Sequence, residues 1–248
     1  MDLAAKQIAV LGAGGSGYAA AALALSLGAS VRVFDSGAPE KLATAVAKFE
    51  VLGAPLTCGE AALVPPHRFD LVVLSPGIDT AWPIARAFAA ASGEVIGEIE
   101  FAWRFSDVPV IGITGTNGKT TTTALVTAML QAAGLRSIAA GNIGLPYSEV
   151  VLSGKPYDLI VLELSSFQLE TITSVSPRIA VWMNFAPDHM DRYATVEDYF
   201  AAKFHLFDYL GEGALVIRKE ECDLGLDART TTFSAFSTSS DLGYRAGE

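Results

Sequence analysis

A glycine-rich segment from Gly112 to Thr122 holds the residues of this chain that are best suited to chemistry. The pattern predicts a buried apolar strand at 108–113 before the segment and an amphipathic helix at 121–131 after it. The amide N–H groups of such a loop, together with the helix N-terminus, suit a bound phosphate group. Lys119 would reach the β- and γ-phosphates of a nucleoside triphosphate, and the Thr120 hydroxyl would ligate Mg²⁺. The loop residues expected around the phosphates are Gly115, Thr116, Asn117, Gly118, Lys119, Thr120 and Thr121.

This segment departs from the general phosphate-loop pattern GxxxxGK(S/T) at one position. The first glycine of that pattern falls on Ile113, so the segment is better written GTNGKT, from Gly115 to Thr120. An ordinary glycine turn is the alternative interpretation. The position of the segment between a predicted strand and a predicted helix favours the phosphate loop.

Glu163 lies near the end of another predicted apolar strand, at 158–164. Phosphate-loop proteins commonly direct a carboxylate at Mg²⁺ from such a position, and a carboxylate in so apolar a run needs a partner. The alternative is an acid paired with a structural arginine or lysine. Ser165 and Gln168 follow directly and are expected to contact the same site.

His189 is the histidine with the strongest case for a ligand. It follows a predicted strand and lies among acidic residues, so a neutral imidazole could serve a second divalent ion or a charged substrate. His67, beside two prolines, and His205, within a predicted helix at 196–210, are interpreted as structural. Lys203 lies on the same predicted helix and is by default a solvated surface lysine, which spacing alone does not overturn.

A second glycine loop lies near the N-terminus, where Gly12, Gly14 and Gly17 match GxGxxG after a short apolar run. Asp35 ends the next predicted strand, where a Rossmann acid bonds a ribose hydroxyl. By itself this pattern indicates NAD(P) or FAD, although the same geometry serves any ligand with a diphosphate. The turn Ser75-Pro76-Gly77 also follows a predicted strand, at the end where open α/β sheets bind ligands. A plain turn is the alternative there.

Composition excludes several classes of protein. The chain has 248 residues, of which 51% are hydrophobic and 18% charged, which predicts a globular protein with a large core. A net charge of −10 without a long basic run argues against nucleic acid as a partner. The distant cysteines Cys58 and Cys222 suggest neither a zinc site nor a disulfide framework. The uncharged run 8–31 contains clustered glycines, so we expect no membrane insertion and a cytoplasmic protein.

Short apolar runs alternate with helical patterns along the chain, which predicts parallel sheets covered by helices and hence an α/β fold. Two units in tandem are expected, each with its own glycine loop. The first, residues 1–97, is predicted to be a Rossmann-like parallel-sheet domain. The second, residues 98–248, is predicted to be an α/β domain of the phosphate-loop ATPase type that is cut short.

Four segments together resemble the Mur ligase family: GTNGKTTTT at 115–123, GNIGLP at 141–146, LELSSFQLET at 162–171 and NFAPDHMDRY at 184–193. The first is shared with sister ligases and folylpolyglutamate synthases, whereas the last two are more specific to the branch that adds D-glutamate. The resemblance covers essentially all of the chain. It implies an ATP-dependent amide ligase of peptidoglycan precursor synthesis, which activates the carboxylate of UDP-N-acetylmuramoyl-L-alanine as an acyl phosphate for attack by D-glutamate.

The resemblance also implies roles for individual residues. Lys119 would orient the γ-phosphate of ATP, Thr120 and Glu163 would hold the first Mg²⁺, and His189 would bind the second. Lys203 matches the position of the family's carbamylated lysine, whose added carboxylate helps to place the second metal. Uridine diphosphate replaces a dinucleotide at the first glycine loop. The residues implied to bind the UDP substrate are Gly14, Gly15, Ser16, Asp35, Ser36, Ser75, Pro76, Gly77, Asn142, Ser165 and Gln168.

Complete family members carry a third, C-terminal domain that holds the incoming amino acid, and no segment of this sequence corresponds to it. We therefore expect a truncated chain that binds the UDP substrate and ligates poorly or not at all on its own. ATP and Mg²⁺ are the expected cofactors, the UDP substrate and D-glutamate the expected ligands, and a monomer the expected state. Two alternatives remain: a non-catalytic nucleotide-binding fragment, and an NAD(P)-dependent oxidoreductase based on GxGxxG and Asp35.

Overall fold

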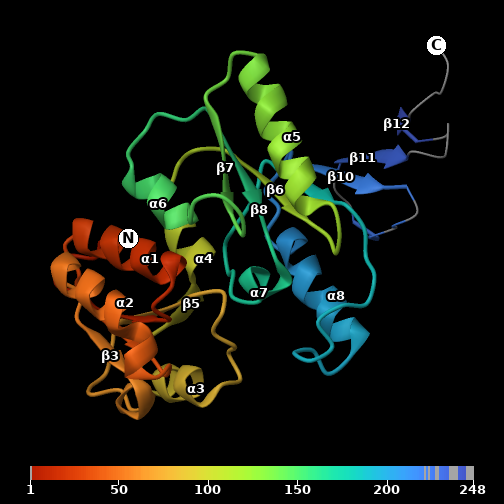
Figure 1. Cartoon of the computed structure of the whole chain (residues 1–248). Coiled ribbons are helices and arrows are strands. Elements are labelled where there is room, and N and C mark those ends of the chain that lie inside the picture. Colours follow the sequence, from red (N-terminus) through yellow and green to blue (C-terminus); the bar gives the residue numbers. More distant parts are fainter. Residues whose placement is uncertain (1, 221, 223, 227–228, 235–239, 244–248) are drawn as a thin grey trace. The chain divides into compact units, whose positions relative to one another are not determined.

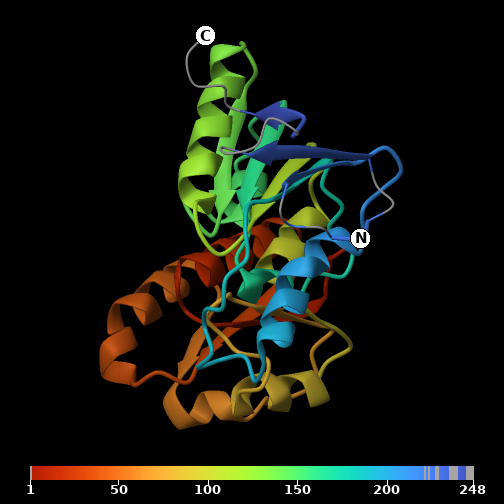
Figure 2. The same ribbon diagram turned by 90° about the vertical axis from the view of Figure 1, so that its right-hand side faces the viewer.

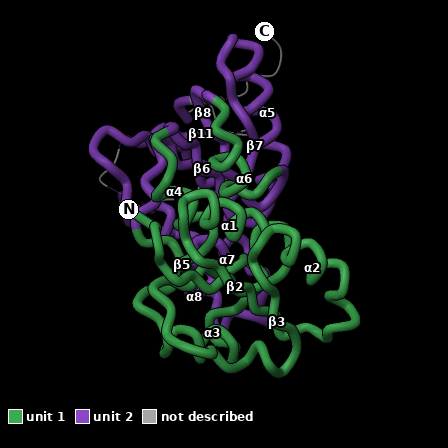
Figure 3. Tube along the Cα trace, turned by 90° about the vertical axis from the view of Figure 1, so that its left-hand side faces the viewer, with its two compact units in different colours: residues 1–107, 145–155, 171–173 green, residues 108–144, 156–170, 174–248 purple. Residues whose placement is uncertain are grey.

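The computed structural model describes residues 2–220, 222, 224–226, 229–234 and 240–243 (Figure 1). Contacts divide the chain into two compact units (Figure 3). Unit 1 comprises residues 1–107, 145–155 and 171–173, and unit 2 comprises residues 108–144, 156–170 and 174–248. Each unit is built on one parallel sheet, which confirms the predicted α/β class. In the described part of the chain, no helix is long and apolar enough to cross a membrane.

The sheet of unit 1 has five parallel strands in the order β3-β2-β1-β4-β5. Its elements are β1 (Gln7–Leu11), α1 (Gly15–Ser26), β2 (Ser30–Asp35), α2 (Pro39–Leu52), β3 (Leu56–Cys58), the 3₁₀ helix η1 (Gly59–Leu63), β4 (Leu71–Leu74), α3 (Pro83–Ala90), β5 (Val95–Gly97), α4 (Glu98–Trp103) and, from the later segment, α6 (Tyr147–Leu152). The strand order reverses between β1 and β4, and open α/β sheets bind ligands at the carboxyl ends of the strands beside such a point.

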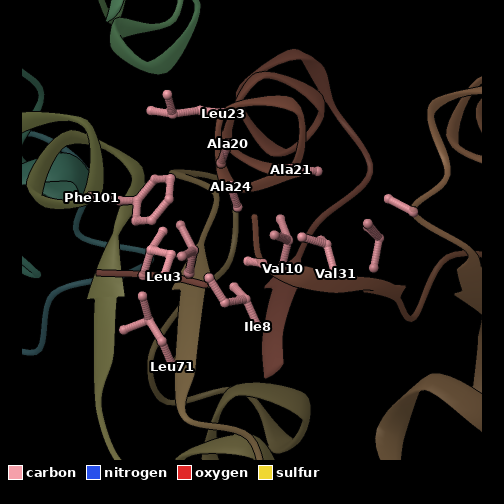
Figure 4. Close-up of a cluster of buried hydrophobic side chains, with 14 of the residues drawn as sticks. Leu3, Ile8, Val10, Ala20, Ala21, Leu23, Ala24, Val31, Leu71 and Phe101 are labelled. Carbon is pink, nitrogen blue, oxygen red and sulfur yellow. The ribbon is translucent and has the colours of Figure 1, made fainter. Parts of the chain in front are cut away.

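Alternate residues of these strands face opposite sides of the sheet, and each side has its own core. On one side, Ile8, Val10 and Val31 pack beneath α1, whose alanines let the helix lie close to the strands (Figure 4). On the other side, the ring of Phe34 lies 4.6 Å from that of Phe88 in α3. Burial on both sides explains why the strands are uninterrupted apolar runs.

Among the described residues, the sheet of unit 2 has seven strands, all parallel, in the order β12-β11-β10-β9-β6-β8-β7. Its elements are β6 (Val110–Thr114), α5 (Lys119–Ala132), β7 (Ser137–Gly141), β8 (Leu159–Glu163), α7 (Ser166–Leu169), β9 (Ile179–Trp182), α8 (Val196–Phe204), the 3₁₀ helix η2 (His205–Phe207), β10 (Leu215–Lys219), β11 (Arg229–Ser234) and β12 (Leu242–Gly243). The helix α5 packs along β6, β7 and β8 (Figure 2). Because β6 lies between β9 and β8, the loop that follows it is flanked by the ends of both strands.

A buried carboxylate in α4 contacts α6 within unit 1. Glu98 is 2% exposed, and its Oε1 accepts a hydrogen bond from the backbone N–H of Ser148 at 2.6 Å. Its Oε2 is buried and has no hydrogen-bond partner among the residues that the structure describes. Burial raises the pKa of Glu98 to about 7, and the hydrogen bond from the Ser148 N–H only partly opposes that rise. The carboxyl group therefore takes up a proton on folding near neutral pH.

Replacing Glu98 by glutamine is expected to remove a pH dependence of stability. The folded pKa of about 7 lies above the unfolded value of 4.5, so only the folded state keeps the proton between these values. Protonated Glu98 therefore stabilises the folded state fully below about pH 4.5, and this stabilisation is lost as the pH rises through about 7. For a shift of this size, the free energy of unfolding falls by about 3 kcal/mol over that range. Thermal unfolding of wild type and Glu98→Gln between about pH 5 and pH 8 measures the difference. Parallel stability profiles for the two proteins would contradict the prediction.

Candidate active site

The glycine loop of unit 2 joins the end of β6 to the start of α5. Gly115 has a φ of 145° and Gly118 a φ of 82°, values that strongly favour glycine. A Cβ atom at Gly115 would also lie 2.8 Å from the Cβ of Met183, so no larger residue fits there. Thr120 and Thr121 lie exposed in the first turn of α5, whose leading N–H groups have no partner within the helix.

Asn184, which follows β9, holds this loop in place. Its Oδ1 accepts a hydrogen bond from the N–H of Asn117 at 2.9 Å, and its Nδ2 donates to the C=O of Asn117 at 3.0 Å. Its backbone C=O accepts a third bond, from the N–H of Thr116 at 3.2 Å. Asn184 was not among the residues predicted from sequence to form the site. The available signal was its position directly after an apolar strand that precedes the acidic segment with His189.

Two lysines converge on one carbonyl group of the loop. The Nζ of Lys119 donates to the C=O of Gly115 at 2.9 Å and to that of Thr116 at 3.0 Å. The Nζ of Lys203, from α8, donates to the same Gly115 oxygen at 2.9 Å. Lys203 is only 2% exposed, so its interpretation as a solvated surface lysine is wrong.

The surroundings of Lys203 disfavour its charged form. Burial lowers the pKa of Lys203 to about 7, the charge of Lys119 acts in the same direction, and Asp188 opposes them. The Lys203 Nζ lies 4.7 Å from the centroid of the Tyr199 ring. The Tyr199 hydroxyl in turn lies 3.4 Å from the hydroxyl of Thr116. A substantial share of this lysine is therefore a neutral amine near pH 7.

Glu163, the last residue of β8, carries a carboxylate oxygen without a partner. The residue is 1% exposed, and its Oε1 accepts a hydrogen bond from the Nδ2 of Asn142 at 2.8 Å. The N–H of Asn142 also donates to the C=O of Glu163 at 2.9 Å. The Oε2 of Glu163 is buried with no hydrogen-bond partner, and no lysine or arginine in the described ranges forms an ion pair with it. The alternative of an acid paired with a structural base is therefore not found, and the free oxygen suits a hard cation.

Ser165 and Gln168 form a capping box at the start of α7. The Ser165 hydroxyl accepts a bond from the N–H of Gln168 at 3.3 Å, and the Gln168 Oε1 accepts one from the N–H of Ser165 at 3.0 Å. Both side chains thus help to start this helix. Their contact with a substrate stays a prediction.

His189 lies in a turn after β9, in contact with the aromatic rings of Phe167 and Tyr199. Its ring centroid lies 4.9 Å from that of Phe167 and 5.8 Å from that of Tyr199. Its Nε2 lies 3.7 Å from the Oδ2 of Asp188. Tyr199 contacts both His189 and Lys203, so the structure brings these two predicted residues to one aromatic ring.

Clusters of three or more His, Cys, Asp or Glu residues suited to a metal are not found among the described residues. Mg²⁺ usually binds through one or two carboxylates and completes its shell with water and substrate phosphates. The unpartnered oxygen of Glu163 fits that pattern of ligands, whereas a site made entirely of protein side chains does not fit this chain.

The glycine loop of unit 1 contains two glycines that the fold requires and two that it does not. A Cβ atom at Gly17 would lie 1.9 Å from the C=O of Gly12, and one at Gly12 would lie 2.9 Å from the Cβ of Ser75. A Cβ atom at Gly14 or Gly15 would meet nothing within 4 Å. The absence of a side chain at these two positions leaves the start of α1 open to a ligand.

Asp35 ties the end of β2 to this loop. Its Oδ2 accepts a hydrogen bond from the N–H of Ala13 at 2.8 Å, and its Oδ1 accepts one from the N–H of Gly37 at 2.8 Å. Ser36 follows Asp35 and is exposed, and Ser16 is half-buried in the first turn of α1. The carboxylate therefore shapes the loop, and its contact with a ligand stays a prediction.

In the turn Ser75-Pro76-Gly77, the first residue is buried and the last is exposed. Ser75 is 8% exposed, and its hydroxyl donates to the C=O of Gly12 at 3.3 Å. Gly77 is exposed, and a Cβ atom there would meet nothing within 4 Å. The structure brings this turn to the first glycine loop, as expected for the ends of the neighbouring strands β1 and β4.

A cavity of about 380 Å³ lies beside the first glycine loop. Lys41 and Lys48 of α2 line it together with Gly14, Gly15 and one acidic residue, Glu149, so the charged lining has two positive groups and one negative group. Neither lysine was predicted from sequence to belong to a site, because two lysines on a helix give no signal by themselves. A second cavity, of about 480 Å³, lies in unit 2 at Phe207 and its neighbours, and no predicted site residue lines it.

Two family descriptions match the chain. The Mur ligase middle domain matches residues 113–241, and the Mur ligase MurD-like, N-terminal domain matches residues 6–97. The chain therefore belongs to the Mur ligase family, which confirms the resemblance carried by the four sequence segments.

Curated relatives carry a more particular name. The UDP-N-acetylmuramoylalanine--D-glutamate ligase of Desulfatibacillum aliphaticivorans is 40% identical over 207 residues, which are 84% of this chain and 46% of that protein. The ligase of the same name from Pelotomaculum thermopropionicum is 38% identical over 216 residues, which are 87% of this chain and 48% of that protein. The chain spans about half the length of the curated relatives it matches.

Among solved structures, a ligase from Neisseria meningitides shares the fold. It is the UDP-N-acetylmuramate:L-alanyl-gamma-D-glutamyl-meso-diaminopimelate ligase, and the match covers 93% of this chain and 78% of that one, with a TM-score of 0.62 and 21% identity. At this identity the likeness shows the fold alone.

Replacing Asn184 by alanine is expected to loosen the glycine loop of unit 2. The variant loses the bond that protects the N–H of Asn117, which is worth about 1 kcal/mol and hence about a fivefold faster amide exchange. Hydrogen exchange of residues 115–118 measures the effect. Asn184→Asp is the matched control, because it keeps the acceptor for Asn117 and should leave that amide protected. Equal exchange in wild type and Asn184→Ala would contradict the prediction.

Proposed function

We propose that this chain supplies the UDP-substrate-binding and ATP-binding parts of a ligase that joins D-glutamate to UDP-N-acetylmuramoyl-L-alanine. The relatives named above, which carry the name of that reaction, support the proposal. The observation that carries it is the meeting of Lys119 and Lys203 on one loop carbonyl, together with the unpartnered carboxylate oxygen of Glu163, which is in register with Ile113 just before the loop. A triphosphate would place its oxygens at the Lys119 ammonium group, and a divalent cation bound to it would meet the Glu163 carboxylate.

The loop of unit 2 would hold the phosphates of ATP. The first N–H groups of α5 have no intrahelical partners and lie at the positive end of the helix dipole. Lys119, which bonds to two loop carbonyls, would turn its ammonium group to the γ-phosphate. Gly115, Thr116, Asn117, Gly118, Thr120 and Thr121 are the other proposed ATP contacts.

Two magnesium ions are part of the proposal. Mg²⁺, when bound, neutralises the oxygens of the transferring phosphoryl group. The Oε2 of Glu163 and the hydroxyl of Thr120 would hold one ion. His189 and carbamylated Lys203 would hold the other. Carbamylation joins the Lys203 nitrogen to CO₂ with release of a proton, and burial of this lysine supplies the neutral amine that the step needs.

The proposed reaction has two steps. The substrate carboxylate attacks the γ-phosphorus of ATP, and ADP leaves, giving an acyl phosphate. The amino group of D-glutamate then attacks the acyl carbon, phosphate leaves, and an amide bond forms. The chain's own residues would position the γ-phosphate through Lys119 and the reacting end of the substrate through Asn142, which two hydrogen bonds fix to Glu163.

The glycine loop of unit 1 would hold the uridine diphosphate group. Gly14 and Gly15 leave space beside the start of α1, and the two lysines of the adjoining cavity, which outnumber its one acid, Glu149, favour a diphosphate. The matched N-terminal domain is that of a Mur ligase, which favours a UDP group over a dinucleotide at this loop. Ser16, Asp35, Ser36, Ser75, Pro76 and Gly77 are the other proposed contacts in unit 1, and Ser165 and Gln168 those in unit 2.

The chain by itself corresponds to only part of its relatives. Because the chain spans about half the length of its relatives, we propose that it binds the UDP substrate and ATP but ligates poorly alone. A cytoplasmic monomer with a substrate domain at 1–97 and an ATP domain at 98–248 completes the proposal. A binder without catalysis is the second candidate.

Calorimetric titration with UDP-N-acetylmuramoyl-L-alanine tests the substrate assignment. Saturable binding is expected, which excess UDP displaces and NAD does not. Gly14→Val should weaken binding at least about tenfold, or 1.4 kcal/mol, because it fills space proposed for the diphosphate, and should cost little stability, because a Cβ atom there meets no protein atom within 4 Å. Displacement by NAD and not by UDP would instead favour an oxidoreductase. A folded chain that binds neither ligand would contradict the proposal for unit 1.

A further inference from the structure

His189 lies in a tight turn with an unusual backbone. Its φ is 55°, which is uncommon for a residue with a side chain. Its C=O accepts hydrogen bonds from the N–H of Arg192 at 3.0 Å and from that of Tyr193 at 3.1 Å. The turn therefore fixes the backbone of His189. Its side chain is 45% exposed and needs other contacts to hold its orientation.

Glu170, which directly follows α7, binds the two residues that end this turn, Arg192 and Tyr193. Its Oε2 accepts a hydrogen bond from the Nη2 of Arg192 at 2.6 Å, and its Oε1 accepts a short one from the Tyr193 hydroxyl. The side chains of Arg192 and Glu170 are only 14% and 18% exposed, so water screens this ion pair weakly. One carboxylate thus holds two successive residues of the turn.

The same short helix also contacts the imidazole. Phe167 precedes Glu170 by three positions, and the guanidinium carbon of Arg192 lies 4.0 Å from the centroid of the Phe167 ring. That ring lies 4.9 Å from the ring of His189. Arg192 therefore pairs with Glu170 and stacks on Phe167 at once, an arrangement that a planar guanidinium suits and a lysine does not.

A second aromatic contact reaches His189 from α8. The ring of Tyr199 lies 5.8 Å from that of His189, at an interplanar angle of 81°. Tyr193 lies 5.2 Å from Tyr199, and its hydroxyl is the group bonded to Glu170. Both rings that contact the imidazole are thus packed against residues that Glu170 holds.

From these contacts we propose that Glu170 and Arg192 are positioning residues, which fix the His189 ring in the orientation that binds a divalent cation. The inference rests on the proposed function, which makes His189 a metal ligand. Residues that orient a metal ligand typically change metal affinity about 10- to 100-fold when they are removed. Glu170 and Arg192 would act through His189 and touch neither the metal nor the substrate.

NMR spectroscopy of the histidine rings tests this proposal. The chain has three histidines, so replacing each in turn assigns the ring signals of His67, His189 and His205. Mn²⁺ is then titrated in the presence of a non-hydrolysable ATP analogue, and the line broadening of His189 reports binding beside its ring. Glu170→Ala and Arg192→Met are expected to weaken this binding at least about tenfold. Arg192→Lys keeps the charge without the planar group, so its Mn²⁺ affinity should lie between that of Arg192→Met and that of wild type.

A matched variant separates positioning from general loss of stability. Arg136 forms an ion pair with Asp158 at 2.7 Å in the same unit, outside the group around His189. Arg136→Met should leave the Mn²⁺ affinity unchanged, and amide spectra verify that every variant is folded. If Glu170→Ala and Arg192→Met are folded and bind Mn²⁺ as wild type does, the proposal is overturned and the metal assignment stands. If Mn²⁺ leaves His189 of the wild type unbroadened, the metal assignment falls and this proposal falls with it.

Discussion

Two lysine side chains share one backbone carbonyl in unit 2, and the rest of the site depends on that arrangement. Lys119 and Lys203 both bond to the C=O of Gly115, and no carboxylate in the described residues forms an ion pair with either lysine. Their mutual repulsion contributes to the lowered pKa of Lys203. Charging Lys203 beside the ammonium group of Lys119 is costly even with Asp188 acting in the opposite direction, and an anion at the loop would relieve that cost.

The parallel sheet explains how the chain assembles this site. The strand β6 lies between β8 and β9, and Glu163 is in register with Ile113, just before the loop. The end of β8 therefore brings a carboxylate, and the end of β9 leads to Asn184, which holds the loop from the other side. Gly115 lets the loop turn close to Met183. Loop, acid and amide meet because three neighbouring strands end at the same edge.

Local patterns made much of the fold predictable. Both glycine loops lie between a strand and a helix, as predicted. They were predictable because the glycines of the turn and the apolar run before it are neighbours in the sequence. The predicted helix at 196–210 instead ends at Phe204 and continues as the 3₁₀ turn 205–207. The sequence near residues 145–155 does not indicate that they belong to unit 1, because this grouping depends on the packing of α6 against α1 and α4.

The site was predictable in its residue types and less so in its roles. Lys203 lies on a helix whose sequence does not reveal which side is buried. Its environment includes a hydrogen bond to Gly115, which lies 88 positions earlier, and spacing along the helix does not predict such a contact. The same limit applies to Asn184, whose partners lie in a loop far from it in sequence. Glu163 differs, because a carboxylate within an apolar strand already signals a missing partner, and its free Oε2 agrees with that signal.

We expect a triphosphate to meet Lys119 while its divalent cation meets the free oxygen of Glu163. Calorimetric titration of wild type and Glu163→Gln with ATP, with and without Mg²⁺, tests it most directly. We predict that Mg²⁺ raises the ATP affinity of wild type at least about tenfold, or 1.4 kcal/mol, and raises that of Glu163→Gln little. Without Mg²⁺, the two proteins should bind ATP alike. An equal gain from Mg²⁺ in both proteins, or no binding of ATP by the folded wild type, would contradict the account.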